Sequence, residues 1–194
     1  MRTTPTGIAR CLSILGHPLV MIPAAVATLM LDGQTPSASL GVLIVGAVAA
    51  VVFAFSWWQV SRGHWQHVDA SNRGERRSLN LFLATALFLA AAIAFYAIPN
   101  RGLSLGLFLS ALLITGLLLT AHWVKFSLHA SFAVFAVALL WPLNVGYVLP
   151  AGLLALGVCW SRVRLARHTV IEVLGGGLFG AFIGALFWTV LPHA

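Results

Sequence analysis

Long stretches without a charged side chain dominate this chain of 194 residues. They contain no Lys, Arg, Asp or Glu, except that the last includes Glu172, and they are residues 11–31, 39–60, 78–100, 102–124, 126–160 and 169–191. An α-helix needs about 20 residues to cross the ~30 Å hydrocarbon core of a bilayer. Because lipid offers the backbone no hydrogen-bonding partner, only helices and closed barrels cross it, and these stretches lack the alternation of barrel strands. The sequence therefore predicts an all-α fold, a polytopic transmembrane helical bundle.

One of the stretches decides how many spans to expect. Residues 126–160 are too long for one crossing, and they are predicted to form a helical hairpin broken around Trp141, Pro142 and Asn144. Counted as two spans, the hairpin brings the number of candidate spans to seven, and we expect a bundle of six to seven spans.

The first stretch, residues 11–31, has two interpretations. Arg2 and Arg10 precede it and small residues follow its apolar part, as in a cleavable signal sequence. Helix-breaking or polar residues interrupt that apolar part, which favours a kinked first helix; they are Gly16, His17, Pro18 and Pro23.

Composition agrees with a membrane location. Hydrophobic residues make up 60% of the chain, charged residues 8%, and the mean hydropathy is +0.98, all far from a soluble domain. No linker or internal repeat divides residues 1–194, so we expect a single integral membrane domain. The net charge of +7 has no soluble basic face to occupy, which excludes nucleic acid as the expected partner and favours anionic membrane lipids.

The basic residues are unevenly placed. If every stretch crosses, all Lys and Arg except Arg101 share one membrane face, which the positive-inside rule assigns to the cytoplasm together with the N-terminus. Three polar clusters fall on that face: residues 62–80, 125–131 and 161–176. These clusters, distant in sequence, are therefore able to form one site.

His168 and Glu172 lie four residues apart at the start of the last helix, so both side chains share one helix face. A carboxylate that accepts the proton of one imidazole nitrogen leaves the other nitrogen free for nucleophilic attack. The alternative is an ion pair at the membrane boundary. Arg162 precedes His168, and its guanidinium suits phosphoryl oxygens, whereas Arg164 and Arg167 favour contact with lipid head groups.

These residues resemble the motifs of a known family, the type 2 phosphatidic acid phosphatase superfamily, over about residues 60–185. Its third motif is Ser-Arg, five residues, His, three residues, Asp, and Ser161, Arg162, His168 and Glu172 keep this spacing with Glu for Asp. Its second motif is Pro-Ser-Gly-His, of which the FSLH sequence keeps Ser127 and His129 and has Leu128 for the glycine. Its first motif is Lys, six residues, Arg-Pro; Arg76 is kept, but Asp69 and Arg77 replace the lysine and the proline.

The resemblance implies a metal-independent membrane phosphatase without a cofactor. His168 would be the nucleophile that forms a phosphohistidine, Glu172 its orienting partner and His129 the general acid. The remaining residues would bind phosphate: Arg162, Arg76, Arg73, Lys125 and Ser127. The expected substrate is a lipid phosphate or polyprenyl phosphate or diphosphate, and the expected location is a bacterial inner (cell) membrane.

Other functions stay open from the sequence. A non-catalytic protein that binds or transports lipid phosphates would use the same basic face. A magnesium-dependent prenyltransferase would need Asp-rich motifs, but Asp32 and Asp69 are the only aspartates. His64 and His67 are spaced as a metal pair, yet no third ligand follows at a recognisable interval, so we expect no metal site. Neither the particular lipid nor the oligomeric state follows from the sequence.

Overall fold

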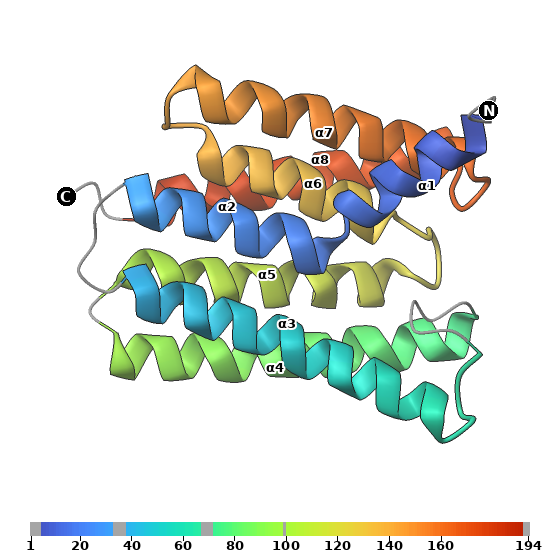
Figure 1. The fold of residues 1–194 in the computed structure, drawn as a ribbon, viewed down its shortest axis with the longest axis horizontal. Helices are drawn as coiled ribbons and strands as arrows, with labels where there is room; N and C mark the ends of the chain where they lie inside the picture. Colours follow the sequence, from blue (N-terminus) through green and yellow to red (C-terminus); the bar gives the residue numbers. More distant parts are fainter. Residues whose placement is uncertain (1–4, 33–37, 67–71, 99, 192–194) are drawn as a thin grey trace. The chain divides into compact units, whose positions relative to one another are not determined.

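A computed structural model describes residues 5–32, 38–66, 72–98 and 100–191. Throughout these residues the regular structure is helical, with no strand, which confirms the predicted all-α class (Figure 1). The helices are α1 (Pro5–Leu15), α2 (Pro18–Asp32), α3 (Ala38–Ser61), α4 (Arg73–Ala97), α5 (Arg101–Thr120), α6 (Leu128–Leu140), α7 (Val145–Arg164) and α8 (Val170–Val190).

The helices form two compact units. The first unit comprises residues 1–35 and 120–194, with α1, α2, α6, α7 and α8, and the second comprises residues 36–119, with α3 to α5. No linker or change of composition marks this division in the sequence. The predicted phosphatase-like core, about residues 60–185, includes parts of both units.

Helix α6 is the core of the first unit. It packs against α2, α7 and α8, while α1 packs on α7 (Figure 1). Phe135 is fully buried, and Phe132 and Leu139 are nearly so. A helix that is apolar on every side, as α6 is, is stable only when other helices surround it.

Glycines let α8 approach α6 closely. A side-chain carbon at Gly180 would collide with the backbone carbonyl oxygen of Ser131, and one at Gly184 would collide with Ala138. Near the far end of α8 the indole N–H of Trp188 donates a hydrogen bond to the Ala138 carbonyl at 2.7 Å. In the sequence Gly176, Gly180 and Gly184 recur at every fourth position, a small-residue spacing that predicts closely packed membrane helices, and the contacts at Gly180 and Gly184 confirm it.

The first apolar stretch is broken rather than continuous. Helices α1 and α2 meet at a 50° bend, and the residues between them are Gly16 and His17. Pro18, which has no N–H to lose, begins α2. Gly16 is required here because a side-chain carbon would collide with Val158 on α7. The predicted kink is thus confirmed at Gly16–Pro18, while Pro23 is accommodated within α2.

The hairpin at residues 126–160 breaks where the sequence predicts, between Leu140 and Val145, and the Asn144 side chain caps α7 by accepting from the Gly146 N–H at 2.8 Å. Its first arm is shorter than expected. With 13 residues, α6 is about 20 Å long, less than the hydrocarbon thickness. Five helices are long and apolar enough to cross a membrane, or six if α1 and α2 form one bent span, in the part of the chain described.

The second unit is built on aromatic packing between α3 and α4. The rings of Phe55 and Phe82 stack with centroids 3.9 Å apart. Asn72 and Glu75 form a reciprocal capping box that begins α4, and the buried Glu75 carboxylate also accepts from the Gln66 N–H at 3.1 Å.

Candidate functional site

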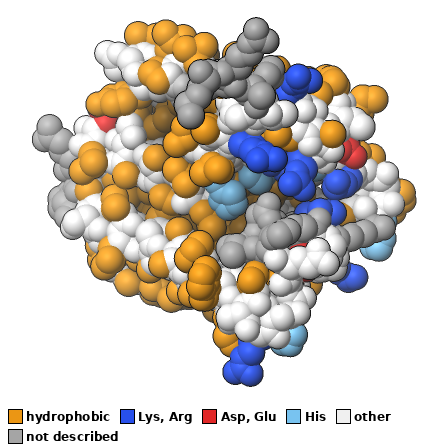
Figure 2. Space-filling view, turned by 45° about the vertical axis from the view of Figure 1, so that its right-hand side comes forward, with side chains coloured by type: hydrophobic (Ala, Val, Ile, Leu, Met, Phe, Trp, Pro, Cys, Tyr) orange, Lys and Arg blue, Asp and Glu red, His pale blue; other side chains and the backbone are white. Residues whose placement is uncertain are grey.

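The starts of three helices converge at one end of the first unit. Ser127 caps α6 and its N–H donates to the Glu172 carbonyl in α8 at 3.1 Å, which joins the starts of these two helices. The His17 ring, at the start of α2, contacts the His129 ring of α6 with centroids 5.1 Å apart. Helix N-termini carry partial positive charge, so their convergence favours an anionic ligand. Figure 2 brings this end forward and shows Lys and Arg side chains beside His side chains.

His168 and Glu172 form the hydrogen bond that their spacing predicts. The His168 Nδ1 lies 3.0 Å from Glu172 Oε2, and the two side chains are only 10% and 21% exposed. The same carboxylate oxygen accepts from the Thr169 N–H at 3.0 Å, within the capping box that begins α8. An ionised Glu172 therefore holds the proton on Nδ1 and leaves the Nε2 lone pair available.

The turn after α7 places His168. Ala166 adopts a left-handed conformation, with φ of 53°, which ends the helix. The Arg162 carbonyl then accepts from both the Arg167 N–H at 3.0 Å and the His168 N–H at 3.3 Å. These bonds tie His168 to the last turn of α7, so the Arg162 and His168 residues belong to one corner of the fold.

The electrostatic surroundings of His168 favour its neutral form. Burial is the main cause that lowers the pKa of the His168 imidazole below its ordinary value, and the nearby cations Arg162 and Lys125 act in the same direction. The hydrogen bond and charge of Glu172 oppose this shift of the pKa. At neutral pH the imidazole is uncharged, as a nucleophile must be.

Arg162 joins the other site residues. Its guanidinium donates to the Ser13 hydroxyl of α1 at 2.9 Å, and it is close enough to act electrostatically on both His168 and His129. Lys125 reaches the same corner, where its ammonium donates to the Arg167 carbonyl at 3.4 Å. Two cations thus accompany the His168–Glu172 pair.

The hydroxyl groups of Ser127 and Ser161 form hydrogen bonds with the backbone of their own helices, which is mainly a structural role. Ser127 is fully buried, and its hydroxyl oxygen accepts from the Ala130 N–H at 3.4 Å. Since its own N–H is bonded to Glu172, the residue fastens α6 to α8. The Ser161 hydroxyl, also fully buried, donates to the Val158 carbonyl of its own helix at 2.7 Å.

The other predicted residues belong to the second unit. Arg76 lies in the first turns of α4, and Arg73 is the first residue of that helix. His64 pairs with the Gln59 side chain at 3.0 Å, and His67 lies outside the described residues. Among the described residues no three His, Cys, Asp or Glu side chains are grouped as metal ligands.

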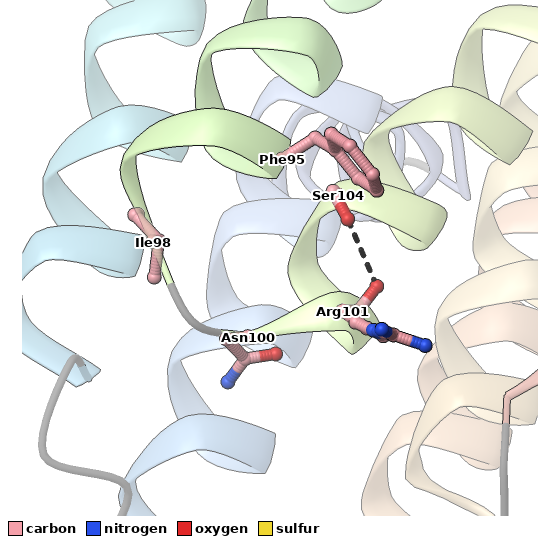
Figure 3. Close-up of a pocket in the computed structure, with 5 residues that line it drawn as sticks. All are labelled: Phe95, Ile98, Asn100, Arg101 and Ser104. Carbon is pink, nitrogen blue, oxygen red and sulfur yellow. Dashed lines mark hydrogen bonds between the residues drawn. The ribbon is translucent and has the colours of Figure 1, made fainter.

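A cavity of about 300 Å³ also lies in the second unit, at the turn between α4 and α5 (Figure 3). It is lined by Phe95, Ile98, Asn100, Arg101 and Ser104. The Ser104 hydroxyl donates to the Arg101 carbonyl at 3.1 Å, and Asn100 caps α5 through the Leu103 N–H. The polar groups that line the cavity therefore mainly form hydrogen bonds at the start of α5. None of the predicted site residues lines the cavity.

Sequence reasoning missed Ser13 and His17. Both come from the apolar first stretch, where neither belongs to a recognisable motif. Only the packing of α1 on α7 and of α2 on α6 brings them to the site. The interruption at Gly16–Pro18 was the available signal, because a helix that breaks within a membrane must have its backbone groups satisfied by neighbours.

No protein-family model, curated protein or solved structure matches the chain. The fold defines its class as an all-α, multi-pass membrane protein. Any more particular function depends on the site residues themselves.

Proposed function

We propose that the protein is a metal-independent membrane phosphatase that hydrolyses a lipid phosphate or diphosphate through a phosphohistidine. The observation that carries this proposal is the buried His168–Glu172 pair beside Arg162 and His129, where α2, α6 and α8 begin. An oriented neutral imidazole within a cationic site suits attack on a phosphoryl group.

The reaction has two steps. The Nε2 lone pair of His168 attacks phosphorus, the bond from phosphorus to the leaving oxygen breaks, and His129 gives that oxygen a proton. In the second step His129 takes a proton from water, the resulting hydroxide attacks phosphorus, and the phosphorus–nitrogen bond breaks to restore His168. Glu172 stabilises the charged imidazole, while Arg162 and Lys125 stabilise the phosphoryl oxygens.

A lipid substrate fits the surroundings of the site. At the start of α8 the large apolar side chains Val170, Ile171 and Leu174 are exposed, so an acyl or prenyl chain would find an apolar surface next to the basic corner. Phosphatidic acid, phosphatidylglycerol phosphate and polyprenyl diphosphates share the phosphoryl head that the proposal requires. We place the enzyme in a bacterial inner (cell) membrane.

One observation favours a second function, non-catalytic binding or transport of a lipid phosphate. Leu128 replaces the glycine expected before His129, and the neighbouring Ser127 N–H is already bonded to the Glu172 carbonyl. A backbone amide that would approach phosphate is therefore occupied. The two functions differ in turnover, because a binding protein releases no phosphate.

Phosphate release by detergent-purified protein tests the proposal. A panel of lipid phosphates, each with and without EDTA, should include a substrate whose hydrolysis is insensitive to EDTA and is inhibited by vanadate, a mimic of the transferring phosphoryl group. His168→Ala should abolish release, since it removes the nucleophile, and His122→Ala is the matched control because His122 is exposed. Loss of activity with EDTA would refute the metal-free mechanism. Lipid binding without release would support the second function.

A further inference from the structure

His17 occupies the break in the first span. Its carbonyl accepts from the Val20 N–H at 2.8 Å and the Met21 N–H at 3.0 Å, and its Nδ1 accepts from the Leu19 N–H at 3.2 Å. The side chain thus does for α2 what Ser127 does for α6, satisfying an N–H that has no partner within its helix.

This hydrogen bond fixes which nitrogen of the His17 ring carries the proton. A nitrogen that accepts a hydrogen bond carries no proton, so the neutral His17 ring has its proton on Nε2. A charged ring would place an N–H against the Leu19 N–H and lose the cap. His17 is therefore held as a neutral ring of defined tautomer and orientation.

His129 lies against this ring, with the two ring centroids 5.1 Å apart. Among the residues that the structure describes, Arg162, His17 and His168 act electrostatically on His129, and none of these three is a carboxylate. The described neighbours of His129 thus differ from those of His168, which has Glu172 to orient it. The ring in contact with His129 is that of His17, perpendicular to it at 89°. Edge-to-face contact restricts both the place and the plane of a ring.

We propose that His17 is a positioning residue that fixes the His129 ring beside Arg162 and His168. The inference rests on the proposed function in that His129 acts there as the acid and base. The broken first span then belongs to the site, because its bend brings the capping side chain of α2 against α6.

His17→Asn separates positioning from folding. Asparagine is a good N-cap and can accept from the Leu19 N–H, so α2 should still begin at Pro18, while the ring against His129 is removed. His122→Asn is the matched control, an exposed histidine of the same unit.

For the hydrolysis of the best lipid phosphate, His17→Asn should lower kcat about 10- to 100-fold and change KM less than about twofold, since a misplaced acid slows chemistry without removing phosphate ligands. The double variant His17→Asn/His129→Ala should be no slower than His129→Ala alone, because the two residues act as one unit. A further additive loss in the double variant, or an unchanged kcat in the single one, would overturn the proposal.

A second measurement does not depend on activity. In ¹⁵N-histidine spectra of the detergent-solubilised protein, His17 should carry its proton on Nε2, and His17→Asn but not His122→Asn should shift the His129 ring signals. A His17 proton on Nδ1, or unchanged His129 signals, would refute positioning. Shifted His129 signals in a protein that hydrolyses no lipid phosphate would uphold positioning and refute the proposed function.

Discussion

At the scale of single residues, the Glu172 carboxylate has two roles, one structural and one chemical, which a single substitution can separate. Its carboxylate closes the capping box of α8 and also holds the His168 imidazole. Glutamine would keep the cap, since it still has a side-chain oxygen, but would lose the charge that supports an imidazolium. The variant Glu172→Gln therefore isolates the chemical role.

Glu172→Gln should lower the plateau kcat about 10- to 1000-fold, less than His168→Ala, and move the acid limb of kcat/KM to lower pH. The sign follows from the causes: burial lowers the pKa of His168 below 6.5, and the Glu172 hydrogen bond and charge raise it, so their loss lowers this pKa further. Activity, which needs the neutral imidazole, then persists to lower pH. A pH–rate profile checks this prediction. A plateau kcat equal to that of the wild-type protein, or an acid limb of kcat/KM moved to higher pH, would show that Glu172 only caps α8.

At the scale of helices, the contact between α6 and α8 holds the site together. Both helices begin at the site, and the Ser127 N–H bond to Glu172 joins them there. Their spacing along the rest of the contact depends on glycines, because side-chain carbons at Gly176, Gly180 and Gly184 would meet atoms of α6. Any residue that separates these helices should also disturb the site.

Gly180→Ala should destabilise the protein by about 1–3 kcal/mol, because the new methyl group meets the rigid Ser131 carbonyl. Gly177→Ala is the matched control on the same helix: its nearest neighbour is Val134 at 3.5 Å, an ordinary contact, and alanine favours the helix by up to about 1 kcal/mol. Thermal unfolding in detergent compares them. A Gly180→Ala protein as stable as the Gly177→Ala protein would contradict the close contact.

At the scale of the whole molecule, charge indicates how the first unit lies in a membrane. Helix α6 starts at the site and α7 returns to it, so both hairpin ends lie together (Figure 1). The described Lys and Arg of this unit are all near that end; they are Arg10, Lys125, Arg162, Arg164 and Arg167. The proposed chemistry needs Lys125 and Arg162, so these two residues say less about orientation. The three remaining arginines still favour, by the positive-inside rule, a site on the cytoplasmic face of the membrane.

Cysteine labelling from outside intact cells tests this orientation. In a protein with Cys11 and Cys159 replaced by serine, a membrane-impermeant thiol reagent should reach Val145→Cys, at the far end of the hairpin, and miss Ala166→Cys, at the site. Both positions are exposed, so accessibility depends on the membrane side. Labelling of Ala166→Cys alone would place the site outside the cytoplasm.

Sequence alone determined the elements whose cause is local. Charge-free stretches specify apolar helices, and Asn144 and Pro142 mark the hairpin turn. The i, i+4 spacing also predicted the contact between His168 and Glu172, but His168 precedes the Thr169 N-cap of α8, so the turn after α7, and not the helical period, places its ring there. Sequence also predicted close packing at Gly180, though not its partner.

Tertiary structure alone decided which helices meet. In a membrane, apolar side chains face lipid as readily as protein, so the apolar pattern that indicates a helix does not indicate its neighbours. The short α6 became the core because α2, α7 and α8 surround it, and His17 reached His129 because the first span bends. These contacts join residues far apart in sequence, and their energy depends on fitting surfaces that no local pattern records.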